Sequence, residues 1–459
     1  MNIYQTFTKT LSAIVSLSLL LAACAPATTA TQSPTNAPAA TNAPAATDAP
    51  APTSAPEPIT LTWLINEGSG AEAMANALIE AYMATHPNVT IELELRPGGA
   101  DGDNIVKTRL ATGEMTDIFL YNSGSLFQAL NPSETMVDLT NEPFMSNVVE
   151  SFFPTVSSEG KIYGAPIGTA LGGGIFYNKK IYADLGLSVP TTWAEFEANN
   201  EKIKAAGIPP VAASYGDTWT SQLFVLADYH NVQQANPTFA EDYTNNKAKY
   251  ATTPEALAGF TYLQTGFEKG WYQPDFATTK YSQALLLLAE GKVAHYPMLS
   301  FVLQDIALNA PDNINDIGFF AQPGPDASTN GATIWMPAGN YIAKTSENIE
   351  AAKDFLAFTV SKEGIEAINA VVPPQGPYLI KGVELPDDAL PAVKDIAAYI
   401  DAGRSTPALE FLSPIKGPNL EQLCVAVGSG QMTAEEAAAA YDEDVKKQAQ
   451  QLGLPGWDN

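Results

Sequence analysis

From residue 59 onward, the pattern of hydrophobic positions alternates between that of a strand and that of a helix. Residues 59–65 are apolar at every second position, which predicts a strand with one buried face. Residues 74–82 repeat apolar side chains at helical spacing, and this helix must end before Pro87, because proline disfavours helical geometry in the residue that precedes it. Residues 89–95 alternate again, so the pattern predicts a β-α-β unit with a right-handed crossover.

The same alternation continues along the chain. Residues 107–113 end a second helix, and residues 117–121 predict a buried parallel strand. Thr192 and Glu195 have the spacing of a capping box, in which the hydroxyl accepts from one backbone amide and the carboxylate from another. The helix that follows leads to residues 208–213, which predict one more strand.

Near the end of the chain, Thr433 and Glu436 predict a second capping box, which opens an alanine-rich helix that ends at Gly453. Strands and helices that alternate along the whole chain predict the α/β fold class with a mostly parallel sheet. In such sheets, ligands bind beyond the carboxyl ends of the strands. Candidate binding residues are therefore sought directly after the predicted strands.

The first 23 residues have the pattern of an export signal. Lys9 is followed by an apolar run at residues 11–20, which is too short to remain as a membrane-spanning helix. Small residues then precede Cys24 in the manner of a bacterial lipobox. We therefore expect a signal peptide at residues 1–23 and acylation of the Cys24 thiol, which would attach the protein to a membrane.

Residues 24–58 are dominated by Ala, Pro, Thr, Ser and Asn. Such a segment buries too little apolar surface to offset the cost of ordering it, so we expect a disordered tether. Its prolines favour extended backbone, and at ~3.1 Å per residue it would reach on the order of 100 Å.

Composition narrows the function. The 459 residues leave room for two domains after the tether, and a formal charge of −27 argues against nucleic acid as a partner. With Cys24 assigned to lipid, Cys424 is left alone and is expected to be buried. The three histidines (His86, His230 and His295) lack the spacing of metal ligands, so no metal or cofactor is predicted.

Six stretches, in this order along the chain, resemble one known family. They are residues 112–117 (TGEMTD), 160–166 (GKIYGAP), 176–180 (FYNKK), 185–196 (LGLSVPTTWAEF), 290–294 (EGKVA) and 349–356 (IEAAKDFL). Together they resemble the family 1 extracellular solute-binding proteins, the sugar-binding lipoproteins of ABC importers. One departure is Thr116, since the family commonly has proline there.

The resemblance implies the two-lobed type II periplasmic-binding-protein fold, with hinge crossovers between the lobes. Carried over, it assigns residues 59–168 and 324–372 to the N-terminal lobe, and 173–318 and 373–459 to the C-terminal lobe. The chain would cross between lobes near residues 167–171, 319–324 and 371–375, where glycines and prolines suit a hinge. Gly172, Gly173 and Gly174 could instead be small residues required by close packing around Phe176.

A sugar site needs aromatic plates for apolar C–H faces, with amide, carboxylate and guanidinium partners for hydroxyls. Phe301 stands in a region where the family has tryptophan. Each candidate also has an ordinary structural alternative, in the core, at a turn or in solvent. The candidates are Glu67, Asn122, Tyr215, Asp217, Trp219, Phe301, Trp335, Asn340 and Arg404.

The resemblance implies a monomeric, extracytoplasmic and lipid-anchored protein that captures a carbohydrate and delivers it to an ABC permease. Two alternatives stay open. One is a binding protein for a non-sugar solute such as a polyol phosphate, a polyamine or a peptide. The other is a surface glycosidase, which would need two carboxylates facing each other at ~5–10 Å. No catalytic residue is predicted.

Overall fold

The computed structural model describes residues 57–336 and 338–458. The predicted signal peptide, Cys24 and all but the last two residues of the predicted tether lie outside the described residues. In this described part, no helix is both long and apolar enough to cross a membrane.

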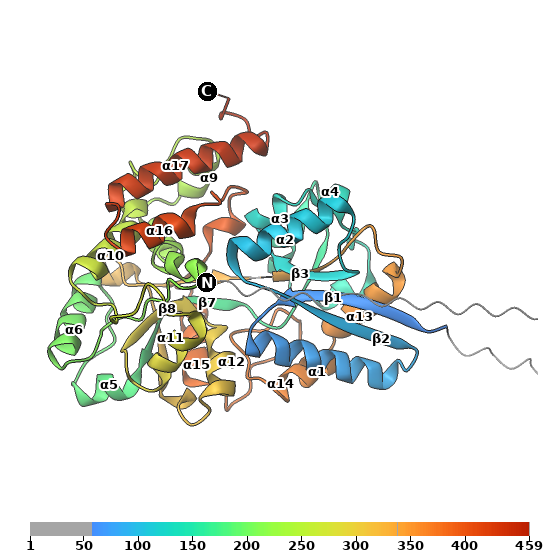
Figure 1. Cartoon of the computed structure of the whole chain (residues 1–459), viewed down its shortest axis with the longest axis horizontal. Helices are drawn as coiled ribbons and strands as arrows, with labels where there is room; N and C mark the ends of the chain where they lie inside the picture. Colours follow the sequence, from blue (N-terminus) through green and yellow to red (C-terminus); the bar gives the residue numbers. More distant parts are fainter. Residues whose placement is uncertain (1–56, 337, 459) are drawn as a thin grey trace, which may run out of the picture. The chain divides into compact units, whose positions relative to one another are not determined.

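A first five-stranded sheet has the order β2-β1-β3-β11-β6, and Figure 1 shows its strands β2, β1 and β3 side by side. Its strands are β1 (Ile59–Asn66), β2 (Val89–Arg96), β3 (Ile118–Asn122), β6 (Gly164–Pro166) and β11 (Ala338–Ile342). Strand β1 pairs in parallel with β2 and β3, whereas β11 is antiparallel to both β3 and β6. The predicted β-α-β unit and the parallel third strand are confirmed.

Two long helices connect the parallel strands of this sheet. Helix α1 (Ser69–Thr85) joins β1 to β2 and ends before Pro87, as predicted. Helix α2 (Gly99–Thr112) joins β2 to β3 and ends at Gly113, whose positive φ of 76° suits glycine. The shorter or later elements on this side are α3 (Ser125–Gln128), α4 (Pro132–Thr135), β4 (Ser157–Ser158), β5 (Lys161–Ile162), α13 (Ile349–Thr359) and α14 (Lys362–Asn369).

A second sheet has the order β12-β10-β7-β8, with β9 also paired to β7. Its strands are β7 (Leu171–Asn178), β8 (His295–Leu299), β9 (Ile317–Ala321), β10 (Ala332–Trp335) and β12 (Ser405–Pro407). Strand β7 is antiparallel to β8, β9 and β10, while β10 and β12 are parallel. The expectation of a mostly parallel sheet therefore holds for β2-β1-β3 and is wrong for this sheet.

Helices cover this second sheet and complete the second lobe, to the left in Figure 1. Both predicted capping boxes are present, at the starts of α6 and α17. The helices are α5 (Lys179–Asp184), α6 (Trp193–Ala205), α7 (Leu223–Leu226), α8 (Tyr229–Ala235), α9 (Phe239–Thr244), α10 (Pro254–Glu268), α11 (Tyr281–Ala289), α12 (Val302–Asn309), α15 (Pro391–Asp401), α16 (Leu420–Gly428) and α17 (Ala434–Gln451). Cys424 is buried among them, as expected.

Residues 208–213 do not form the predicted regular strand. Only Val211 makes isolated bridges, to Tyr272 and His295. Pro209 and Pro210 have no N–H group, so the segment offers carbonyls to β8 but cannot return a continuous set of donors. The prediction was wrong because two prolines override the apolar pattern.

The chain passes between the two sheets after β6, after β10 and before α15. The first passage lies at residues 167–170, close to its expected place. The second follows Trp335 rather than residues 319–324, because β10 still pairs with β7 in the second sheet. Before the third passage, residues 378–381 remain paired with Val148 and Thr169, so this passage follows residues 371–375.

The glycine triplet lies inside β7 and is required for close packing. A methyl group added at Gly173 would lie 2.1 Å from the Trp335 ring, and one added at Gly172 would lie 2.8 Å from Ile396. At Gly174 the close neighbour would be the Phe320 carbonyl oxygen, at 2.6 Å. The close-packing alternative is therefore correct, with Trp335 and Ile396 as neighbours rather than Phe176.

Candidate functional site

The carboxyl ends of the three parallel strands bring buried polar side chains together. Asn66 ends β1, Arg96 ends β2 and stands opposite Asn66 in the pairing register, and Tyr121 lies one residue before the end of β3. Among the side chains that the structure describes, four buried atoms here lack a hydrogen-bond partner of ordinary geometry: Asn66 Oδ1, Arg96 Nε, Tyr121 Oη and Ser125 Oγ. Buried polar atoms are almost always satisfied, so such a group indicates a site for a ligand or ordered water.

Arg96 is the central charge of this group and is only 3% exposed. Its guanidinium lies 5.4 Å from the centre of the Tyr121 ring and 4.0 Å from Asp103 Oδ1 in α2. Burial lowers the pKa of Arg96 and raises the pKa values of Asp103 and Tyr121. At 4.0 Å, the attraction between Arg96 and Asp103 offsets little of the free energy that their desolvation costs. We therefore infer that Arg96 serves ligand binding rather than stability.

The second lobe brings an aromatic cluster to the same region. Trp219, Tyr281 and Phe301 have ring centroids 5.3 to 5.9 Å apart. The loop after β2 lies against Trp219, because a methyl group added at Gly98 would lie 3.3 Å from the indole nitrogen. We call the contact region between the strand ends of the first lobe and this cluster the seam.

A second group of polar side chains, Glu410 and Lys416 of the second lobe, also lies at the seam. Trp335 Nε1 donates a hydrogen bond of 2.5 Å to Glu410, and Lys416 Nζ lies 3.6 Å from the same carboxylate. The positive charge of Lys416 also acts on Asp103 in the first lobe. A cavity of about 20 Å³ is lined in part by Trp335, Glu410 and Lys416, with room for roughly one water molecule.

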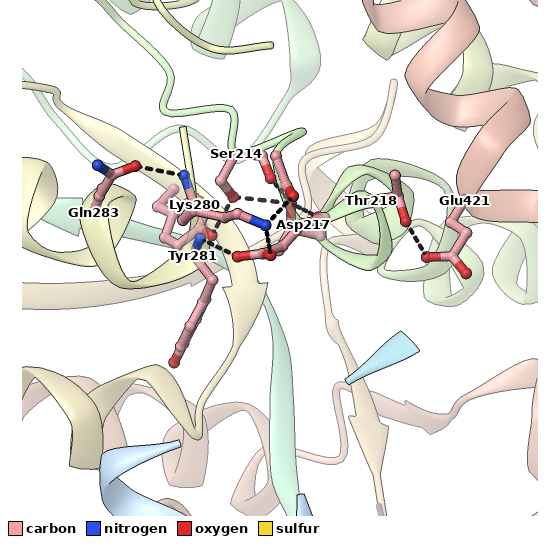
Figure 2. A network of polar contacts seen from close by, with 10 residues as sticks. Ser214, Asp217, Thr218, Lys280, Tyr281, Gln283 and Glu421 are labelled. Carbon is pink, nitrogen blue, oxygen red and sulfur yellow. Dashed lines mark hydrogen bonds and ion pairs between the residues drawn. The ribbon is translucent and has the colours of Figure 1, made fainter. Parts of the chain in front are cut away.

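Asp217 holds the aromatic cluster in place. Its carboxylate accepts hydrogen bonds from the backbone N–H of Tyr281 (2.7 Å) and from Lys280 Nζ (2.8 Å), as Figure 2 shows. Asp217 thereby fixes the start of α11 beside the 3₁₀ helix Thr218–Gln222, which carries Trp219. In this structure Asp217 is a positioning residue for Trp219 and Tyr281.

The structure separates the sequence-predicted candidates into two groups. Trp219 and Phe301 contact each other at the seam, and Trp335 packs in the same small cluster as Phe301. Asn122 lies at the end of β3 opposite Ala338, next to Ser123, whose hydroxyl donates to the carbonyl of Met336. These residues remain candidates for ligand contact.

The other candidates lie elsewhere or already have partners. Tyr215 is buried in the second-lobe core against Tyr272 and Phe276. Asn340 is fully buried; its Oδ1 accepts from Trp63 Nε1 at 3.1 Å, and its Nδ2 has no hydrogen-bond partner among the described residues. The remaining two are exposed: Glu67 follows β1 with its side chain in solvent, and the Arg404 guanidinium stacks 5.0 Å from the Tyr399 ring.

Several seam residues escaped the sequence analysis: Arg96, Asp103, Tyr121, Tyr281, Glu410 and Lys416. A signal existed for two of them, since Arg96 ends an alternating strand and Tyr121 directly precedes Asn122. The rule that selected Glu67 after the first strand would have selected Arg96, which directly follows the predicted strand at residues 89–95, but not Tyr121, the last residue of the predicted strand at 117–121. The others reach the seam from helices and loops distant in sequence.

Two α/β lobes, joined by several passages of the chain and meeting at a polar and aromatic seam, define the two-lobed class of solute-binding proteins. Residues 62–366 match the family model of the bacterial extracellular solute-binding protein. The chain belongs to this family.

Related proteins agree in sequence and in fold. The chain is similar to the multiple sugar-binding protein of Streptococcus mutans, with 24% identity over 69% of this chain and 74% of that protein. It is 25% identical to the diacetylchitobiose binding protein DasA of Streptomyces coelicolor, over 66% of this chain and 69% of that protein. A solved chitin oligosaccharide binding protein shares the fold with a TM-score of 0.73, at 24% identity over 86% of this chain and 99% of that one. The solved structure of RafE in complex with raffinose also shares the fold, with a TM-score of 0.69 and 20% identity over 86% of this chain and 99% of that one.

Proposed function

We propose that this protein captures a carbohydrate at the seam between its two lobes and delivers it to an ABC transporter permease. The observation that carries the proposal is the pairing of an aromatic cluster (Trp219, Tyr281 and Phe301) with incompletely hydrogen-bonded polar strand ends. Aromatic rings suit the apolar faces of a sugar, and polar groups suit its hydroxyls.

The ligands of similar proteins support a carbohydrate over other solutes. Multiple sugars, diacetylchitobiose, chitin oligosaccharide and raffinose are named for proteins similar to this chain. We infer an oligosaccharide rather than a phosphate, because a phosphate site would gather several cations, and the strand-end group of the first lobe contains Arg96 beside the carboxylate of Asp103.

We infer that the protein works outside the cytoplasm, as a monomer held to a membrane through lipid on Cys24. Family membership and the lipobox sequence support this placement. Replacing Cys24 by serine should release the protein from the membrane fraction into the soluble fraction. A Cys24→Ser protein that still sediments with membranes would contradict the lipid anchor.

The direct test is isothermal titration calorimetry of the purified protein against a panel of neutral oligosaccharides. We expect saturable binding of at least one of them. Polyol phosphates, polyamines and short peptides form the comparison panel. If one of these bound and every neutral saccharide failed, the carbohydrate proposal would be wrong.

The same samples test the enzyme alternative. After long incubation with the bound saccharide, mass spectrometry should recover the ligand intact, because we infer capture without chemistry. If hydrolysed product formed in proportion to the protein concentration, the protein would be a glycosidase rather than a binding protein.

A further inference from the structure

Helices α1 and α2 of the first lobe begin at glycines, Gly68 and Gly98, which have no side chain to cap them. The first N–H groups of a helix need acceptors and carry partial positive charge. In this structure the second lobe supplies acceptors. Gly70 N donates to Asp305 Oδ1 at 2.7 Å, and Ala100 N donates to Glu421 Oε1 at 3.2 Å.

Both carboxylates are buried, and each is also held within its own lobe. The second oxygen of Asp305 accepts a hydrogen bond from the Tyr281 hydroxyl at 2.5 Å. The second oxygen of Glu421 accepts one from the Thr218 hydroxyl at 2.8 Å, as Figure 2 shows. Each carboxylate therefore bridges a helix start in one lobe and a hydroxyl in the other.

Glycine permits this close approach. A methyl group added at Gly70 would lie 2.8 Å from Gln304 Cβ, next to Asp305 in α12. One added at Gly99 would lie 3.3 Å from Glu421 Oε2 and 3.3 Å from Trp219 Cβ. Larger residues at these positions would hold the lobes apart.

The bridges are connected to the aromatic cluster. Thr218 directly precedes Trp219, and Tyr281 is itself a member of the cluster. Closing the lobes through Asp305 and Glu421 therefore sets the aromatic rings against the first lobe in the same step.

We propose that Asp305 and Glu421 are closure residues: by capping α1 and α2, respectively, across the seam, they populate the closed arrangement of the lobes without ligand. A binding-competent arrangement that is already populated raises the apparent affinity for any ligand that prefers it. This inference goes beyond the proposed function, because it holds whatever solute the protein binds.

Distances between spin labels in the unliganded full chain test the proposal. Labels at Thr108→Cys in α2 and Ser282→Cys in α11 occupy exposed positions, one in each lobe. All samples carry Cys24→Ser, and the remaining Cys424 is buried. Pulsed electron resonance then measures the fraction of molecules with the short, closed distance.

We expect a measurable short-distance fraction in the unsubstituted protein. Its ratio to the open fraction should fall on the order of 10-fold in the double variant Asp305→Asn with Glu421→Gln, which replaces two charge-assisted hydrogen bonds with neutral ones. Ala100→Pro removes the donor instead of the acceptor at a helix position that tolerates proline, and should act in the same direction.

The matched control is Asp444→Asn. Asp444 is equally buried and accepts from Asn419 N (2.8 Å) and Asn419 Nδ2 (2.7 Å), all inside the second lobe. This variant should leave the distance distribution unchanged. Thermal unfolding checks that every variant folds cooperatively.

Three results would overturn the proposal. The first is an unsubstituted protein with no short-distance fraction. The second is an unchanged fraction in both the double variant and Ala100→Pro. The third is an equal fall in Asp444→Asn. None of these depends on carbohydrate binding, so they are distinct from a failure of the calorimetric panel.

Discussion

Two pairs of buried polar residues differ in how completely they are hydrogen-bonded: Arg96 and Tyr121 in the first sheet, and His295 and Asn178 in the second. At the end of the first sheet, Arg96 Nε and Tyr121 Oη find no partner of ordinary geometry among the described residues. In the second sheet, both ring nitrogens of His295 have partners, the Tyr182 hydroxyl at 2.8 Å and the Pro210 carbonyl at 2.9 Å. Asn178 is likewise satisfied through Lys180 N and the Leu288 carbonyl.

This difference distinguishes buried polar groups that stabilise the fold from buried polar groups that are available to a ligand. A buried group with all its hydrogen bonds made stabilises one local structure, whereas a buried group left incomplete keeps capacity for a partner from outside. We therefore expect substitutions at His295 and Asn178 to change stability alone. Those at the seam should also change ligand binding.

The largest effect is expected at Arg96. Arg96→Met would leave the partly buried Asp103 carboxylate without its closest cation, so the free energy of unfolding should fall by about 3 kcal/mol. Urea unfolding measures the change. The double variant with Asp103→Asn should recover most of the loss, and a single variant as stable as the unsubstituted protein would contradict the role of the pair.

His295 should give the next largest effect, through pH. Burial lowers its pKa to about 3, so the folded protein keeps this imidazole neutral while the unfolded chain takes up a proton below about pH 6.5. The stability this group contributes is present above pH 6.5 and is lost as the pH falls toward 3, by up to about 1.4 kcal/mol per pH unit. His295→Gln should flatten this slope in urea titrations between about pH 4.5 and about pH 6.5. Parallel curves for the two proteins would refute the assignment.

Trp219→Ala tests the aromatic side of the seam. Losing the indole should weaken carbohydrate affinity by roughly 10- to 30-fold in calorimetry, with cooperative unfolding retained, because Trp219 is only partly buried. Trp193→Phe is the control, since the Trp193 ring stacks on Tyr262 at 3.7 Å inside the second lobe. If both variants lost carbohydrate affinity equally, the aromatic residues of the seam would have no special role in binding.

The smallest effect is expected at Arg404, which the sequence nominated as a ligand donor. Its exposed side chain stacks on Tyr399 away from the seam, so Arg404→Ala should leave affinity unchanged and stability within about 0.5 kcal/mol. A clear loss of affinity would show that the ligand site extends beyond the seam.

Local signals predicted local structure well. The β-α-β unit, the helix end at Gly113 and the capping boxes at Thr192 and Thr433 all depend on residues within a few positions of one another. Trp219 could be nominated because it follows the predicted strand at residues 208–213, and Phe301 because the resembling family has tryptophan in that region. Tyr215 follows the same predicted strand as Trp219 but is buried in the second-lobe core, and the pattern along the chain does not distinguish the two outcomes.

The sequence by itself determined the alternation of strands and helices and the family to which they belong, because these depend on periodicity and on short ordered motifs. Tertiary structure decided that β10 joins β7, that Gly173 makes room for Trp335, and that Glu421 caps a helix more than 300 residues away. These outcomes depend on which surfaces meet after the lobes assemble. A contact between distant segments leaves no period in either segment, so only the folded molecule reveals it.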